Sequence, residues 1–134
     1  MDREIKFRVY DLLRGKIVSP ELCEYYFSNN QLCIGNSNWA EEAFGNYPIM
    51  QYTGLKDKNG KEIYEGDIVE FKTNYTNKKG GWLNGVVIWD SERYGWALNA
   101  ENTIYDIYDE TEGFEYIVKH IGNIYENPEL LTNN

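Results

Sequence analysis

The chain has 134 residues, of which 42% are hydrophobic and 16% aromatic, so it is too rich in core-forming residues to be disordered. Its 13 Lys and Arg residues stand against 22 Asp and Glu residues, which gives a formal charge of −9. No apolar run approaches the roughly 18 residues of a membrane span, and the charged start MDREIKFRVYD has no signal-peptide features. We therefore expect a soluble, acidic protein of the cytoplasm that does not bind a membrane.

The N-terminal part of the chain predicts short β-strands joined by turns. Residues 4–9 alternate apolar and charged side chains, which is the two-residue period of a half-buried strand. Arg14-Gly15 then turns the chain into a returning strand that ends near residue 18. Weaker strands are expected at 23–27 and 31–34. Residues 35–48 form an irregular connection with at most two helical turns around 39–44.

The second half predicts a more regular series of strands. Asn59-Gly60 indicates a hairpin over 55–64 with a type I′ turn, in which both central residues have positive φ. Strands are expected at 67–72, 86–89, 94–98, 104–108 and 116–121, and the run 86–89 is apolar enough to be buried on both faces. Asn127-Pro128 begins a short C-terminal turn. Such a series is typical of a small barrel or sandwich, so we expect a mainly β fold with little helix.

No motif in the sequence indicates catalysis or metal binding. His120 is the one histidine and lies in a predicted strand, where we expect a hydrogen-bonded or merely exposed side chain and no catalytic base. Glu65 and Asp67 are two residues apart and would share a strand face, but such pairs are common in acidic chains. Asp57 begins a segment that resembles a calcium loop in composition and differs from it in spacing. We therefore expect no enzyme, no metal and no cofactor.

A basic segment interleaved with aromatic side chains is the first candidate binding surface. It comprises Lys72, Tyr75, Lys78, Lys79 and Trp82. Cations next to aromatic rings can clasp single-stranded nucleic acid, whereas the net charge of the chain repels a polyanion.

An acidic cluster is the second candidate surface. It comprises Asp106, Asp109, Glu110 and Glu112. Blocks of like charge usually face water, but carboxylates at this density also present a negative surface to a basic partner.

Three segments resemble the YopX family of phage and prophage proteins: MDREIKFRVYD at 1–11, YTGLKDKNGKEIYEGDIV at 52–69 and IGNIYENPELL at 121–131. The resemblance extends over nearly all of residues 1–134, which implies a single YopX-like domain. It implies an SH3-like barrel over 49–134, a smaller N-terminal β region over 1–48, self-association, and a place in the bacterial cytoplasm. It implies no catalytic residue, cofactor or ligand.

We therefore predict a non-enzymatic phage or prophage accessory protein that binds a host protein and copies of itself. One alternative is a barrel that binds nucleic acid through the basic segment. Another is an acidic decoy that occupies a host nucleic-acid-binding protein through the acidic cluster.

Overall fold

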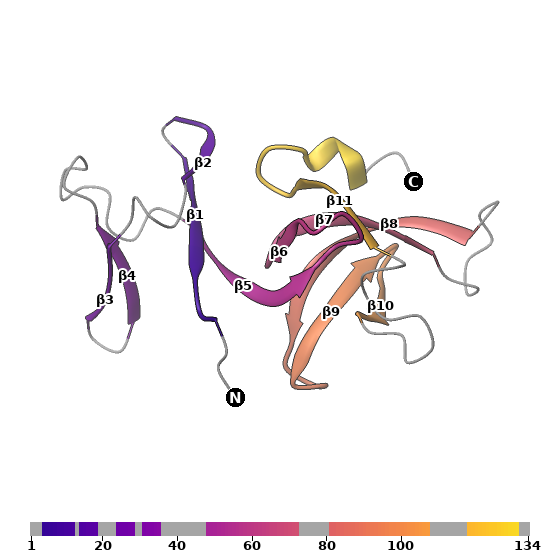
Figure 1. Cartoon of the computed structure of the whole chain (residues 1–134), viewed down its shortest axis with the longest axis horizontal. Helices are drawn as coiled ribbons and strands as arrows, with labels where there is room; N and C mark the ends of the chain where they lie inside the picture. The colour runs from indigo at the N-terminus through magenta and orange to yellow at the C-terminus, as the bar shows by residue number, and fades with distance from the viewer. Residues whose placement is uncertain are drawn as a thin grey trace. The chain divides into compact units, whose positions relative to one another are not determined.

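The computed structural model describes residues 4–12, 14–18, 24–28, 31–35, 48–72, 81–107 and 118–131 (Figure 1). The chain forms two compact units: unit 1 contains Met1–Ile5 and Tyr52–Asn134, and unit 2 contains Lys6–Gln51. Over the described ranges the fold is mainly β, with a single short 3-10 helix. No helix in this part of the chain is long and apolar enough to cross a membrane. The elements are β1 (Phe7–Asp11), β2 (Lys16–Val18), β3 (Glu24–Ser28), β4 (Gln31–Gly35), β5 (Ile49–Lys56), β6 (Glu62–Tyr64), β7 (Asp67–Lys72), β8 (Trp82–Asp90), β9 (Gly95–Ala100), β10 (Thr103–Asp106), β11 (Val118–Asn123) and the 3-10 helix η4 (Pro128–Leu131).

In unit 2, β1 pairs antiparallel with β2 and with the first residues of β5, and β3 pairs with β4. The expected turn between β1 and β2 is confirmed. The Asp11 carboxylate accepts hydrogen bonds from the Arg14 amide and guanidinium, both at 3.1 Å. Gly15, at a φ of 69°, donates its amide to the Asp11 carbonyl. Glycine adopts this left-handed conformation without the steric cost that a Cβ would add.

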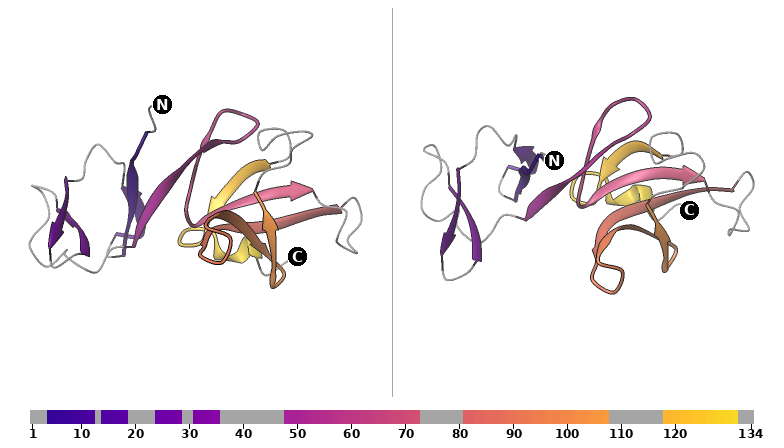
Figure 2. Two further views of the ribbon diagram at one scale, coloured as in Figure 1. Left: turned by 90° about the horizontal axis from the view of Figure 1, so that it is seen from below. Right: turned by 60° about the horizontal axis from the view of Figure 1, so that its bottom comes forward.

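Unit 1 is built on a five-stranded antiparallel sheet in the order β10-β9-β8-β7-β11. Strands β7 to β10 follow one another as a meander, and β11 returns to lie on the far side of β7. Figure 2 shows that this sheet is curled, so that it forms a half-barrel. Strand β7 supplies three buried side chains, Ile68, Val69 and Phe71. The core cluster comprises Ile63, Val69, Phe71, Leu83, Val87, Leu98, Ala100 and Ile107.

The C-terminal segment packs on the outer side of the sheet. Helix η4 contacts β8, and the Leu130 carbonyl accepts a hydrogen bond of 2.9 Å from the Asn84 side chain. Gly122 in β11 lies against Asn127, whose side-chain oxygen would be 2.6 Å from a Cβ at that position. This close approach permits only glycine at residue 122 unless Asn127 moves.

The β5–β6 hairpin exists, but the predicted type I′ turn is wrong. The Asp57 carbonyl accepts a hydrogen bond from the Gly60 amide, and the Asp57 amide donates to the Lys61 carbonyl. Gly60 has a φ of 82°, whereas Asn59 is not in the positive-φ region. This arrangement is typical of a type I turn followed by a left-handed glycine. The Asp57 carboxylate favours it by accepting hydrogen bonds from the Asn59 and Lys61 amides.

A hairpin loop with two positive φ values occurs instead between β9 and β10. Ala100 pairs with Thr103, and the two residues between them, Glu101 and Asn102, have φ values of 51° and 64°. Their conformation matches the type I′ loop that the sequence suggested elsewhere.

Two further expectations about β8 and β9 are corrected. The run 86–89 is not buried on both faces, because β8 continues past the core to Asp90 and leaves Trp89 51% exposed. Tyr94 is not in the strand that was expected at 94–98, since β9 begins at Gly95 and Tyr94 lies in the preceding turn. The helical turns expected around 39–44 lie outside the described residues.

Candidate functional site

A buried polar cluster joins three segments of unit 1. One carboxylate oxygen of Asp57 accepts hydrogen bonds from the amides of Asn59 and Lys61, each at 2.9 Å. The other oxygen accepts the amide of His120, also at 2.9 Å. Asp57 therefore ties strand β11 to the tip of the β5–β6 hairpin, over a separation of 63 residues.

The charge of Asp57 is stabilised by these donors. Burial raises the pKa of the Asp57 carboxyl, but the three backbone amides and the nearby His120 lower it by more, so that the pKa lies below its usual 3.8. Asp57 is consequently ionised at neutral pH, and both oxygens are occupied by main-chain donors. This geometry gives the carboxylate a role in holding the hairpin.

His120 faces the second buried carboxylate. Its Nε2 lies 3.2 Å from Oδ1 of Asp67, although this buried nitrogen is not oriented for a hydrogen bond. Oδ2 of Asp67 accepts the amide of Tyr64 at 2.8 Å. The predicted pairing of Glu65 with Asp67 on one strand face is wrong, because Glu65 lies in the turn before β7 and Asp67 is the first residue of that strand.

Across the described ranges, no three His, Cys, Asp or Glu side chains gather closely enough to hold a metal ion.

An exposed aromatic surface lies at the turn end of the β8–β9 hairpin. Trp89 and Trp96 are cross-strand partners whose rings meet edge to face, with centroids 5.3 Å apart and planes at 81°. Trp96 packs partly against the core, while Trp89 is 51% exposed and Tyr94 is 84% exposed. We name this surface, with the adjoining Asp90, Glu92, Arg93 and Asp106, the aromatic end.

Two ion pairs brace the aromatic end, and one of its residues has a strained backbone conformation. Arg93 lies 3.4 Å from the Asp90 carboxylate and 3.0 Å from that of Asp106, so it ties the β8–β9 turn to β10. Tyr94 has a φ of 54°, a left-handed conformation that costs a bulky residue on the order of 1 kcal/mol. Tyr94 and Trp89 thus place two exposed aromatic side chains near the β8–β9 turn.

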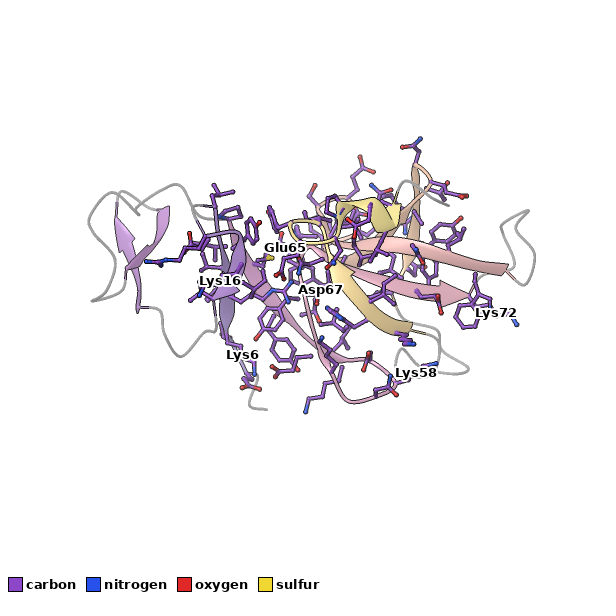
Figure 3. All side chains as sticks on the ribbon, turned by 90° about the horizontal axis from the view of Figure 1, so that it is seen from above. Lys6, Lys16, Lys58, Glu65, Asp67 and Lys72 are labelled. Atoms are coloured by element: carbon purple, nitrogen blue, oxygen red, sulfur yellow. The ribbon has the colours of Figure 1, made fainter. Side chains whose placement is uncertain are left out.

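The predicted basic segment is only partly described. Lys72 ends β7, where Figure 3 labels it, and it is the cross-strand partner of Trp82, which is 42% exposed. The structure thus brings one cation and one aromatic ring of this segment together. The remaining members, Tyr75, Lys78 and Lys79, lie outside the described residues.

The predicted acidic cluster is represented by Asp106 alone. Its side chain is 80% exposed and pairs with Arg93. Asp109, Glu110 and Glu112 lie outside the described ranges.

A group of exposed lysines was not predicted from the sequence. Lys56, Lys58 and Lys61 are exposed around the hairpin tip, and Lys119 is exposed next to His120, whose amide binds Asp57. Figure 3 shows Lys58 at the tip. We name these four lysines the lysine edge. The alternation of Lys with an inward-facing Asp in LKDKNGK was the available signal, because an Asp bound by backbone amides leaves its neighbouring lysines on the surface.

The comparisons with known proteins agree with this architecture. The crystal structure of protein EF1440 from Enterococcus faecalis superimposes with a TM-score of 0.56 at 26% sequence identity, covering 97% of this chain and 99% of that chain. No curated protein matches the chain. The model of the YopX protein family matches residues 6–132, nearly the whole chain, and the chain therefore belongs to the YopX family.

Proposed function

We propose that this chain is a non-enzymatic accessory protein of a phage or prophage that binds proteins, including copies of itself, through the aromatic end. It acts in the cytoplasm of the bacterial host. The exposure of Trp89 and Tyr94 on a braced hairpin is the observation that carries this proposal.

The composition of the aromatic end supports a protein interface. Trp, Tyr and Arg are the residues most enriched among those that dominate binding energy at interfaces. Trp89, Tyr94 and Arg93 lie within six residues of one another along the chain, and Trp96 anchors Trp89 to the core. Rigid aromatic side chains lose little conformational entropy when a partner covers them.

The strand order supports a finer description of the scaffold as an SH3-like barrel. In unit 1 a meander of four strands is completed by a fifth that pairs with the first, and the sheet is curled (Figure 2). Such a scaffold places its binding residues on the connections between strands. The β8–β9 turn is one of these connections.

Sedimentation equilibrium of the full chain tests self-association up to about 100 μM, which covers weak interfaces. We expect the wild type to associate and the Trp89→Ser/Tyr94→Ser variant to associate at least about tenfold more weakly. Trp82→Ser is the matched control, because Trp82 is also an exposed Trp of β8 but lies at the opposite end of that strand. Capture from a host lysate with the same three proteins extends the test to other partners.

Two results would overturn the proposal. The first is that the wild type does not self-associate and captures no partner that is lost with the Trp89→Ser/Tyr94→Ser variant. The other is equal weakening by Trp82→Ser, which would place the interface elsewhere.

Nucleic-acid binding is the second candidate, favoured by the pairing of Lys72 with the exposed Trp82. It predicts that single-stranded oligonucleotides quench Trp fluorescence at low salt, and that Lys72→Glu weakens this binding. If no oligonucleotide binds at low salt, this candidate is excluded.

A further inference from the structure

The aromatic end and the lysine edge differ in the sign of the charge that predominates among their described residues. The aromatic end carries three carboxylates and one cation: Arg93 pairs with Asp90 and Asp106, and the exposed Glu92 precedes it in the chain. At the lysine edge, four lysines are exposed, and the Asp57 carboxylate among them faces inward onto backbone amides. The carboxylates that adjoin the lysine edge are the half-buried Glu62 and Glu70, the cross-strand partners of Lys56 and Lys119.

The sheet holds these two groups apart. The Asp57 carboxylate at the hairpin tip accepts a hydrogen bond from the His120 amide in β11. His120 is the cross-strand partner of Val69 in β7, and Val69 is the cross-strand partner of Gly85 in β8. Trp89 is four residues further along β8, and β8 is separated from β11 by β7. At about 3.3 Å per residue and 4.8 Å per strand, the two backbones are roughly 16 Å apart. Within the described structure, no ion pair involves any of the four lysines.

We propose that the aromatic end of one copy binds the lysine edge of a second copy, so that the chains associate head to tail. This inference rests on the self-association in the proposed function and names its geometry. Opposite charges on the two surfaces attract, and lysine ammonium groups are favourable partners for the exposed faces of Trp89 and Tyr94.

A contact between two copies of the aromatic end fits the charges less well. In a two-fold contact each surface meets itself, so the carboxylate excess at the aromatic end would face an identical excess. The head-to-tail contact instead pairs unlike surfaces and leaves one free surface of each kind on every pair. It therefore builds rings or filaments rather than closed dimers.

A charge swap tests this geometry. Lys58→Glu and Glu92→Lys should each weaken self-association in sedimentation equilibrium by roughly tenfold, because each sets like charges against each other. Combining both changes in one chain should restore association to near the wild-type level. An equimolar mixture of the two single variants should also associate more tightly than either variant alone.

Lys16→Glu is the matched control, since it makes the same charge change on an exposed lysine of unit 2 and should leave association unchanged. Raising the salt from about 0.05 M to 0.5 M should weaken association of the wild type, because salt screens unlike charges.

The outcomes separate this inference from the proposed function. If Trp89→Ser/Tyr94→Ser weakens association but the charge swap does not restore it, the head-to-tail geometry is wrong and the aromatic end remains an interface. Association that strengthens with salt likewise refutes the geometry. If the wild type remains monomeric, self-association is refuted and the head-to-tail contact with it.

Discussion

Replacing Asp57 should destabilise the protein strongly, although the residue lies at the tip of a hairpin. Asp57→Ala removes three hydrogen bonds to backbone amides at 2.9 Å. A hydrogen bond to a charged group contributes about 1.5–3 kcal/mol when buried, and less where water can replace the lost acceptor. We assign about 1 kcal/mol each to the local bonds of Asn59 and Lys61, and about 1.5 kcal/mol to the bond with His120. The expected loss is about 3–4 kcal/mol of the free energy of unfolding, a large share of the usual 5–15 kcal/mol.

Asp57→Asn separates the two contributions. The amide oxygen of Asn can still accept the local hydrogen bonds, but its NH2 group cannot accept the His120 amide. The expected loss is therefore only about 1.5 kcal/mol, and it reports the tie between the hairpin and β11. Urea unfolding followed by Trp fluorescence measures both variants. Asp106→Ala serves as a control, since that side chain is 80% exposed and its replacement should change stability by less than about 0.5 kcal/mol.

The stabilisation by Asp57 should also depend on pH. The pKa of Asp57 is lower in the folded protein than its ordinary 3.8, because backbone amides favour the charged form. The stabilisation by the Asp57 carboxylate is thus fully present above the pKa of the unfolded state and is lost as the pH falls through the pKa of the folded state. The difference in the free energy of unfolding between the wild type and Asp57→Asn should be constant above about pH 5 and should shrink below about pH 4. A loss under about 1 kcal/mol for Asp57→Ala, or a difference that grows on acidification, would refute this account.

Four further substitutions test the packing and the backbone conformation of unit 1 by urea unfolding. Gly122→Ala should lower the free energy of unfolding by about 2 kcal/mol or more, because a Cβ there would lie 2.6–2.9 Å from the Asn127 side chain. Gly95→Ala is its control: a Cβ there has no heavy atom closer than 3.9 Å, so stability should change by less than about 1 kcal/mol. Gly60→Ala should cost about 1 kcal/mol through backbone strain alone, since its φ is 82° and its Cβ would meet open space; a neutral effect would contradict the assigned turn. Leu98→Ala should cost about 2–5 kcal/mol by leaving a cavity in the core, and a loss below about 1 kcal/mol would show that the site collapses.

The alternation of side chains in the sequence predicted most strands, because burial on one face of a sheet leaves a two-residue period. The turn at Arg14-Gly15 followed from local chemistry and was correct. The type of the turn at Asn59-Gly60 did not follow, because it depends on a side chain outside the dipeptide. The Asp57 carboxylate accepts hydrogen bonds from the amides of Asn59 and Lys61, and no rule based on the dipeptide alone includes Asp57.

The candidate surfaces were harder to predict than the strands. Trp89 ends an apolar run, and its exposure depends on β8 extending past the core, which only the pairing with β9 defines. The lysine edge brings Lys119 beside a hairpin about sixty residues earlier in the chain, through the Asp57–His120 hydrogen bond. Proximity of that kind is a property of topology and cannot be read from local sequence.

The pairing of β11 with β7 also determines when the sheet can be completed during translation. Strands β7 to β10 can pair soon after they leave the ribosome, since each lies next to its neighbour in sequence. Strand β7, however, has no partner on its other side, and Asp57 lacks the His120 amide, until residues 118–123 have emerged. A nascent or prematurely terminated chain therefore exposes an open strand edge, which is a common template for aggregation. Translation that stalls before β11 should yield insoluble product, whereas chains that have passed Asn123 can close the sheet.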